Sequence, residues 1–385
     1  MSEIEGVTAL HFWWLFVVIL ACASMASLHA DQLAHRLGEP LGTIVLTLSA
    51  IVIEVAMVAA VMLNNEQPDP YVARNTMFAT LMIILNGLVG LALLIGGWRR
   101  HEQVFNLQSS STYLSLLIPL ATITLVLPHF TKSSQAGFMA RHLEIFVSIA
   151  CILVYASFLW LQTSRYRSFF SAAPEHASPP STEPKDTPEV DGSDAEMRLL
   201  ARLEARFSTE DELQMGDAPK PAEPEDCHLR TATRSTPPAW RSATLLLLHL
   251  ALVVVLAESL GEEATGMLTE LNLPLALTGV LVAVLILAPE GLAAVVSAKR
   301  DSMQRTMNIL LGSALSTIGL TAPAVLGLSM WLGSPVALGL EPAEIVLLVA
   351  TLMLCMNNFL RGKVNTMQGI VHLTLFFAYC ALLFD

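Results

Sequence analysis

The sequence predicts an all-α polytopic membrane protein with about ten transmembrane helices, arranged as two inverted five-helix repeats joined by a polar, largely disordered linker. Three observations predict this fold. Of the 385 residues, 54% are hydrophobic and only 14% are charged, with a mean hydropathy of +0.59, which is too apolar for an ordinary soluble domain. Apolar segments of spanning length recur on both sides of one polar stretch. In each set, one segment carries a lone glutamate near its middle.

The spans follow from the length of the apolar runs. About 20 apolar residues cross the hydrocarbon core, and they do so as helices because backbone groups in lipid must be satisfied within the segment. Such segments are expected at 7–28, 40–63, 75–97, 110–130, 142–163, 241–261, 274–298, 306–331, 341–360 and 366–384. The predicted domains are therefore a first repeat at 1–170, a linker at 171–240 and a second repeat at 241–385.

The linker is acidic and rich in proline. It holds fifteen Asp or Glu against seven Lys or Arg, so most of the net charge of −12 is local to it. Its ten prolines and low apolar content predict disorder, because it cannot bury enough surface to fold alone. Segment 195–207 places apolar residues on one helical face, which indicates a short amphipathic helix; a flexible tether is the alternative.

Basic residues in the short connections predict the orientation. With ten crossings, one side receives Arg36, Arg99, Arg100, Arg165, Arg167, Arg241, Lys299, Arg300, Arg305, Arg361 and Lys363. The opposite connections hold only Arg74, Lys132 and Arg141. The first side is therefore expected to be cytoplasmic, together with the linker, and both termini to face outward. The spans that carry the two lone glutamates then run in opposite directions, as an inverted repeat requires.

Glu54 and Glu290 are the main candidate site residues. Each is the only charged residue in its apolar run, and a carboxylate at bilayer depth is costly unless it has a partner, so such residues usually mark an ion or proton pathway. Helix packing is the alternative. When the halves are superposed in sequence, Glu54 pairs with Glu290 at an offset of 236 residues and Asn86 with Thr317 at an offset of 231.

These residue types suit a hard cation. Calcium prefers oxygen ligands, so Glu54 and Glu290 are the predicted metal ligands, and Asn86, Thr317 and Ser313 are candidates for neutral oxygens. Ser313 lies one helical turn before Thr317 on the same face. For these three polar residues, contacts between helices are the alternative role. Pro289, directly before Glu290, is expected to break that helix and free backbone carbonyls.

The glutamate pair also predicts an exchange mechanism. Two carboxylates without a cation repel each other and lose solvation, which favours their protonated form. Protons and cation then compete for one site, and reorientation with neither is disfavoured because it would bury naked charge. Motifs of the HExxH, P-loop or nucleophile-elbow type do not occur. We therefore expect an ion antiporter that is not an enzyme, has no cofactor and binds no nucleic acid.

Several stretches also resemble a known family, in matching order. They are HADQLAHRLGEPLGTIVLTLSAIVIEVAMVAAVM (29–62), NGLVGLALLIGG (86–97), LVAVLILAPEGLAAV (281–295), MNILLGSALSTIGLTAPAV (307–325) and HLTLFFAY (372–379). In these motifs the chain is similar to the bacterial ChaA-type calcium or sodium:proton antiporters of the cation/calcium exchanger superfamily.

The resemblance implies a multi-pass transporter of the bacterial inner membrane that exports Ca2+, with Na+ and K+ as further candidates, in exchange for protons. It places the paired acidic residues of the superfamily on Glu54 and Glu290, and its polar positions on Asn86 and on 313–317. Two alternatives remain: a monovalent Na+/K+:proton antiporter without Ca2+ transport, and a non-transporting membrane scaffold or sensor whose working part is the linker.

Overall fold

The structure is a computed structural model and describes residues 3–37, 41–63, 70–99, 103–131, 137–163, 239–360 and 363–384. Residues 171–238 of the predicted linker, with its amphipathic segment 195–207, lie outside the described residues, whereas the last two residues of the predicted linker begin helix α10. The domain boundaries remain a prediction. The helices in the first repeat are α1 (Glu3–Leu37), α2 (Leu41–Leu63), α3 (Val72–Met82), α4 (Val89–Arg99), α5 (Leu107–Ala121), α6 (Leu127–Phe130) and α7 (Arg141–Thr163). Those in the second are α10 (Ala239–Glu270), α11 (Ala276–Lys299), α12 (Met303–Ser316), α13 (Ala322–Leu332), α14 (Pro342–Phe359) and α15 (Thr366–Leu382).

The predicted fold class is confirmed. Within the described residues, eight helical stretches are long and apolar enough to cross a membrane, and shorter apolar stretches at Thr47–Ala60 and Thr366–Leu382 complete ten. Three spans are joined pieces, because a π-helical turn connects α3 to α4 (η1, Ile83–Leu88), α5 to α6 (η2, Thr122–Val126) and α12 to α13 (η3, Thr317–Thr321).

The spans α1 and α10 are longer than their hydropathy predicts. The apolar run of α10 was expected to end at 261, but the helix continues through Glu262 and Glu263 to Glu270. Two causes extend it: Glu and Ala are good helix formers, and α1 packs along α10. At this end His11 of α1 lies 3.0 Å from the Glu263 carboxylate.

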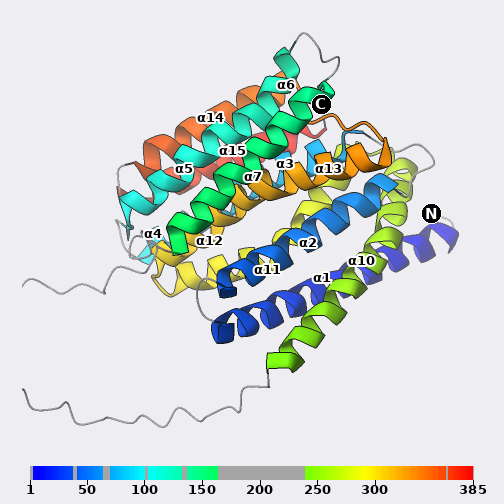
Figure 1. The fold of residues 1–385 in the computed structure, drawn as a ribbon, viewed down its shortest axis with the longest axis horizontal. Coiled ribbons are helices and arrows are strands. Elements are labelled where there is room, and N and C mark those ends of the chain that lie inside the picture. Colours follow the sequence, from blue (N-terminus) through cyan, green and yellow to red (C-terminus); the bar gives the residue numbers. More distant parts are fainter. Residues whose placement is uncertain are drawn as a thin grey trace, which may run out of the picture. The chain divides into compact units, whose positions relative to one another are not determined.

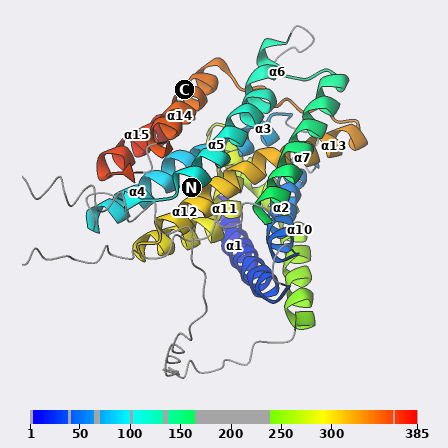
Figure 2. The same cartoon turned by 60° about the vertical axis from the view of Figure 1, so that its left-hand side comes forward.

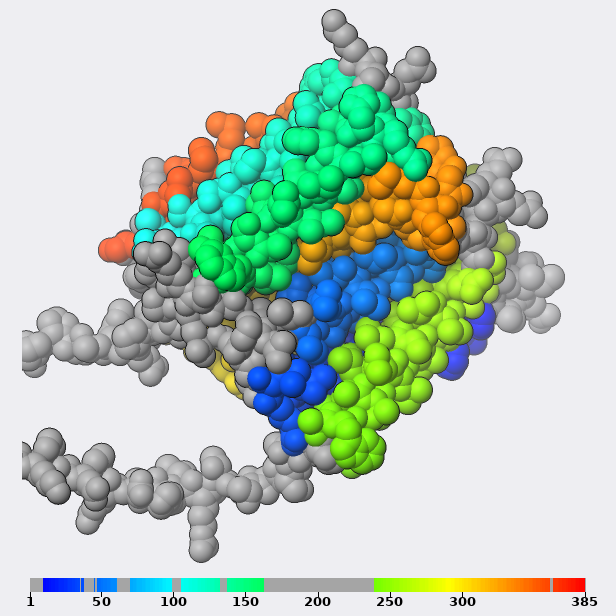
Figure 3. All heavy atoms as spheres, viewed as in Figure 1, coloured from blue at the N-terminus to red at the C-terminus, as the bar shows by residue number. Residues whose placement is uncertain are grey.

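Figures 1 and 2 show α1 and α10 side by side on one side of the helix bundle and α14 and α15 on the other. Between them, α11 packs against α3 and α12. The crossing of α11 and α3 is close, because a Cβ atom at Gly279 would lie 2.8 Å from the backbone carbon of Asn75. On the face shown in Figure 3, α2 lies between α10 and α13.

The connections repeat one pairing at each end of the bundle. At one end, β1 (Gln103–Val104) pairs antiparallel with β2 (Lys363–Val364), which joins the loop after α4 to the loop after α14. At the other end, Phe138 and Ala337 form an antiparallel bridge between the loop after α6 and the loop after α13. Inversion of the two halves exchanges these two pairs of loops, so the contacts support the inverted repeat.

Candidate functional site

Glu54 lies in the middle of α2 and is buried, with 4% of its surface exposed. Its Oε2 atom accepts hydrogen bonds from the Thr321 hydroxyl at 2.7 Å and from the Thr317 hydroxyl at 3.3 Å. Its Oε1 atom is buried and has no hydrogen-bond partner among the described residues. One carboxylate oxygen is thus held by the π-turn η3, and the other is available for a ligand.

Glu290 approaches the same region from α11. The hydroxyl of Ser313 hydrogen-bonds to its carboxylate, and Glu290 lies close enough to Glu54 for a direct electrostatic interaction. Its Oε2 atom is also buried without a hydrogen-bond partner in the described part of the chain. Four of the five predicted site residues, Glu54, Glu290, Ser313 and Thr317, therefore gather where α2 and α11 meet the α12–η3 segment.

The expected break at Pro289 is wrong. Helix α11 continues through Pro289 from Ala276 to Lys299. A transmembrane helix tolerates a proline when its surroundings satisfy the freed backbone groups. The irregular backbone lies instead in the next span, at η3.

The π-turn η3 leaves one backbone carbonyl, that of Ile318, without its α-helical donor. The N–H of Ala322 reaches back five residues to the Thr317 carbonyl, so it does not serve Ile318, its ordinary α-helical partner. Pro323, the next residue, has no N–H to donate. The Ile318 carbonyl thereby loses both of the donors that follow it, directly between the two threonines that bind Glu54.

Tyr155 of α7 completes the surroundings of the pair. Its hydroxyl hydrogen-bonds to Thr47 of α2 and interacts electrostatically with Glu290. The ring packs against η3, where a Cβ atom at Gly319 would lie 2.7 Å from Tyr155 Cδ2. Sequence reasoning missed Tyr155, Thr47 and Thr321. A search at helical spacing would have found Thr321, because it lies four residues after Thr317.

Asn86 is buried, but its side chain is engaged elsewhere. Its Nδ2 atom donates to the Thr351 hydroxyl at 2.8 Å, and its Oδ1 atom lies 3.3 Å from Nδ1 of His372. Two residues later, Leu88 faces α11, since it lies next to Gly291. The structure thus places Asn86 in a network with α14 and α15, and its hydrogen bonds do not reach either glutamate. A ligand role for Asn86 remains a prediction.

Taken together, the site offers two carboxylates, several hydroxyls and one backbone carbonyl. Within the described residues, no group of three or more His, Cys, Asp or Glu side chains converges. The arrangement therefore supplies oxygen ligands for a hard cation, with at most two negative charges.

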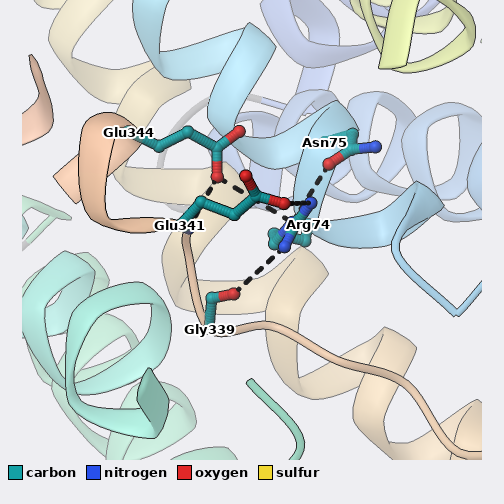
Figure 4. A network of polar contacts seen from close by, with 5 residues as sticks. All are labelled: Arg74, Asn75, Gly339, Glu341 and Glu344. Carbon is teal, nitrogen blue, oxygen red and sulfur yellow. Dashed lines mark hydrogen bonds and ion pairs between the residues drawn. The ribbon is translucent and has the colours of Figure 1, made fainter. Parts of the chain in front are cut away.

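A second polar cluster lies at one end of the bundle (Figure 4), and we refer to Arg74, Gly339, Glu341 and Glu344 as the charged clasp. Arg74, only 7% exposed, donates to the Gly339 carbonyl at 3.4 Å and to Glu341 Oε1 at 3.5 Å. Glu344 Oε2 lies 4.0 Å from Arg74 Nε and accepts the backbone N–H of Glu341 at 2.8 Å. The clasp joins the start of α3 to the N-terminus of α14.

The other end of the bundle carries a neutral counterpart, which we call the amide clasp: Gln304, Asn106, Asn308 and Ser109. The Gln304 Oε1 atom accepts the backbone N–H of Asn106, the N-cap of α5, at 2.6 Å. Asn308 Oδ1 accepts from Gln304 Nε2 at 2.9 Å and from the Ser109 hydroxyl at 3.0 Å. The two clasps are related by the inverted repeat. In the charged clasp, the first turn of α3 contacts the N-cap of α14, the helix that follows α12–α13. In the amide clasp, the first turn of α12 contacts the N-cap of α5, the helix that follows α3–α4.

Two inverted helical repeats with acidic residues at mid-span define the class of secondary ion transporters. A family model described as "Sodium/calcium exchanger protein" matches residues 7–164 and 241–384, and the chain belongs to this family.

The chain is also similar to individual proteins in sequence and to a solved structure in fold. The chain is 33% identical over 366 residues to the sodium-potassium/proton antiporter ChaA of Escherichia coli, covering 95% of this chain and 86% of that protein. It is 24% identical over 302 residues to the Ca(2+)/H(+) antiporter of Aphanothece halophytica, covering 77% and 70%. The structure of native YfkE superposes with a TM-score of 0.68 at 16% identity, covering 99% of this chain and 96% of that one, which shows a shared fold.

Proposed function

We propose that this protein exports Ca2+ in exchange for protons by alternating access, with Na+ and K+ as further transported cations. Glu54 and Glu290 are the shared carriers of cation and protons, and Thr317, Thr321 and Ser313 support them. The observation that carries the proposal is the meeting of the two carboxylates, each with one buried oxygen that lacks a hydrogen-bond partner in the described residues.

The charge balance explains the exchange. Two ionised carboxylates match one divalent cation, and two protons neutralise them equally well. When the site is loaded with cation or protonated, its access can change from one side of the membrane to the other without exposing uncompensated charge to a low-dielectric environment. An empty, ionised site would expose such charge. No cofactor is required, because the driving force is the proton gradient.

The surroundings of the protein follow from the same proposal. We place it in the bacterial inner membrane, with the basic connections and the linker 171–240 on the cytoplasmic side. Its partners are then the transported ions and the lipid bilayer, and the linker is dispensable for transport itself.

A monovalent Na+/K+:proton antiporter is the second candidate. The relative ChaA carries that activity in its name. Among the described residues, no third acidic side chain joins the two glutamates, and a site with few negative charges favours cations of lower charge.

Everted membrane vesicles with an imposed proton gradient test the proposal. Adding Ca2+, Na+ or K+ should dissipate the gradient for the wild-type protein, and Glu54→Gln and Glu290→Gln should each abolish the response, because neither variant can hold cation and proton in turn. Glu144→Gln is the matched control, since Glu144 is also a buried glutamate in a span but lies in the first turn of α7.

The outcomes separate the candidates. A response to Na+ and K+ without Ca2+ selects the monovalent antiporter. No response to any cation refutes transport and favours the scaffold or sensor. Normal transport by both glutamine variants refutes the site while leaving the function.

A further inference from the structure

A chain of buried side chains crosses from α14 and α15 to the π-turn η1. His372 of α15, 0% exposed, lies between Asn358 and Asn86: its Nε2 atom is 3.1 Å from Asn358 Nδ2, and its Nδ1 atom is 3.3 Å from Asn86 Oδ1. Asn86 Nδ2 then donates to Thr351, whose hydroxyl donates to the Leu347 carbonyl at 2.8 Å. The four side chains of this hydrogen-bonded network, those of Asn358, His372, Asn86 and Thr351, are all buried.

The contacts define which ring nitrogen carries the proton. Asn358 Nδ2 is a donor, so His372 Nε2 accepts, and Nδ1 of the neutral ring is the protonated atom. Nδ1 therefore donates toward Asn86 Oδ1. Every bond from Asn358 to Leu347 then points in one direction, which orients the Asn86 amide.

His372 also serves the backbone of η1. The N–H of Val89 reaches back to the Ile84 carbonyl, so the Leu85 carbonyl loses its ordinary α-helical partner. The His372 ring also donates to this Leu85 carbonyl, and because Nε2 accepts from Asn358, the Nδ1–H is shared between the Leu85 carbonyl and Asn86 Oδ1. In the equivalent turn η3, the Ile318 carbonyl likewise loses its α-helical donor, and the hydroxyls of Thr317 and Thr321 bind Glu54.

The π-turn η1 in turn positions Glu290. Leu88, the last residue of η1, packs on α11 so closely that a Cβ atom at Gly291 would lie 3.2 Å from its Cδ1 and Cδ2 atoms. Gly291 directly follows Glu290. Leu88 thus packs directly against the α11 backbone one residue after Glu290, which is the contact through which the η1 turn can act on the position of the Glu290 carboxylate.

We propose that His372 is a positioning residue for cation binding: its Nδ1–H holds the Asn86 amide and the η1 turn, which sets where Glu290 stands relative to Glu54. This inference rests on the proposed function. It assigns His372 a hydrogen-bonding role at a distance from the ion rather than contact with it.

The test compares variants that keep or lose a donor at the position of Nδ1. His372→Asn keeps an amide N–H there, His372→Gln moves it outward toward Asn358, and His372→Leu removes it. We expect His372→Leu and His372→Gln to raise the KM for the transported cation about three- to ten-fold, the range for one buried hydrogen bond, and His372→Asn to restore it. Thr374→Ala is the control, since Thr374 is exposed on α15 and bonds within its own helix.

A double-mutant cycle tests the route. If His372 acts through Asn86, the KM of His372→Leu/Asn86→Leu should be raised less than the product of the single effects. A fully multiplicative effect, or equal KM values for the Asn, Gln and Leu variants in folded protein, overturns the inference. A wild-type protein that transports no cation instead overturns the proposed function, so the two failures are distinct.

Discussion

The hydrogen bond from Thr321 to Glu54 gives the sharpest test of the site. Thr321→Val keeps the shape of the side chain but removes the hydroxyl that donates to Glu54 Oε2 at 2.7 Å. A hydrogen bond to a charged group contributes about 1.5–3 kcal/mol, which corresponds to about a ten- to hundred-fold change in binding. Because the lost bond favoured the ionised carboxylate, protons compete better with the cation. Transport should then require a higher cation concentration and a pH about 1–2 units more alkaline.

The assay is the pH dependence of Ca2+- or Na+-induced proton release in everted vesicles. Thr317→Val removes the longer bond of 3.3 Å and should produce a smaller change in the same direction. Thr321→Ser retains the donor and should remain close to the wild type. An unchanged pH profile for both valine variants would show that Glu54 does not titrate with transport. A larger change for Thr317→Val than for Thr321→Val would show that the shorter bond is not the stronger one.

Other predictions follow from single contacts. Pro323→Ala restores an N–H that can satisfy the Ile318 carbonyl, so the cation KM should rise while the folded yield is unchanged; equal KM values would exclude that carbonyl as a ligand. Gly319→Ala places a Cβ atom 2.7 Å from Tyr155 Cδ2 and should cost roughly 1–3 kcal/mol of stability, measured as a fall in Tm, whereas Gly327→Ala, with open space around it, should not. Arg74→Met should cost about 1–3 kcal/mol by leaving the Gly339 carbonyl and Glu344 without their cation, whereas Arg305→Met, which removes an exposed arginine at the start of α12, should leave Tm unchanged. Ca2+ at 100 times its Kd should stabilise the wild type by about 2.7 kcal/mol, and Glu54→Gln should lose that gain.

The number and type of the spans could be predicted because lipid leaves the backbone little choice. Hydropathy found ten segments, but it misplaced the ends of α1 and α10. Charged residues end the apolar run there, whereas the helices themselves continue because they pack against each other. Glu54 and Glu290 were visible for the same reason: a lone charge in an apolar run is conspicuous.

The local backbone at the site could not be predicted in the same way. Pro289 seemed the natural helix breaker by residue type, but α11 absorbs it, whereas Pro323 accompanies a π-turn. The difference depends on tertiary neighbours. The η1 turn, for example, relies on His372, which lies 286 residues from Asn86 in the chain, and no local pattern announces that partnership.

The two clasps also separate the ends of the molecule chemically. Ion pairs weaken in salt and vanish when the carboxylates are protonated, whereas hydrogen bonds between amides respond to neither. The charged clasp lies at the end that the distribution of basic residues assigns to the outside, and the amide clasp at the cytoplasmic end. With this orientation, an acidic or saline medium outside the cell is expected to weaken the charged clasp, whereas the hydrogen bonds of the amide clasp are independent of both salt and protonation.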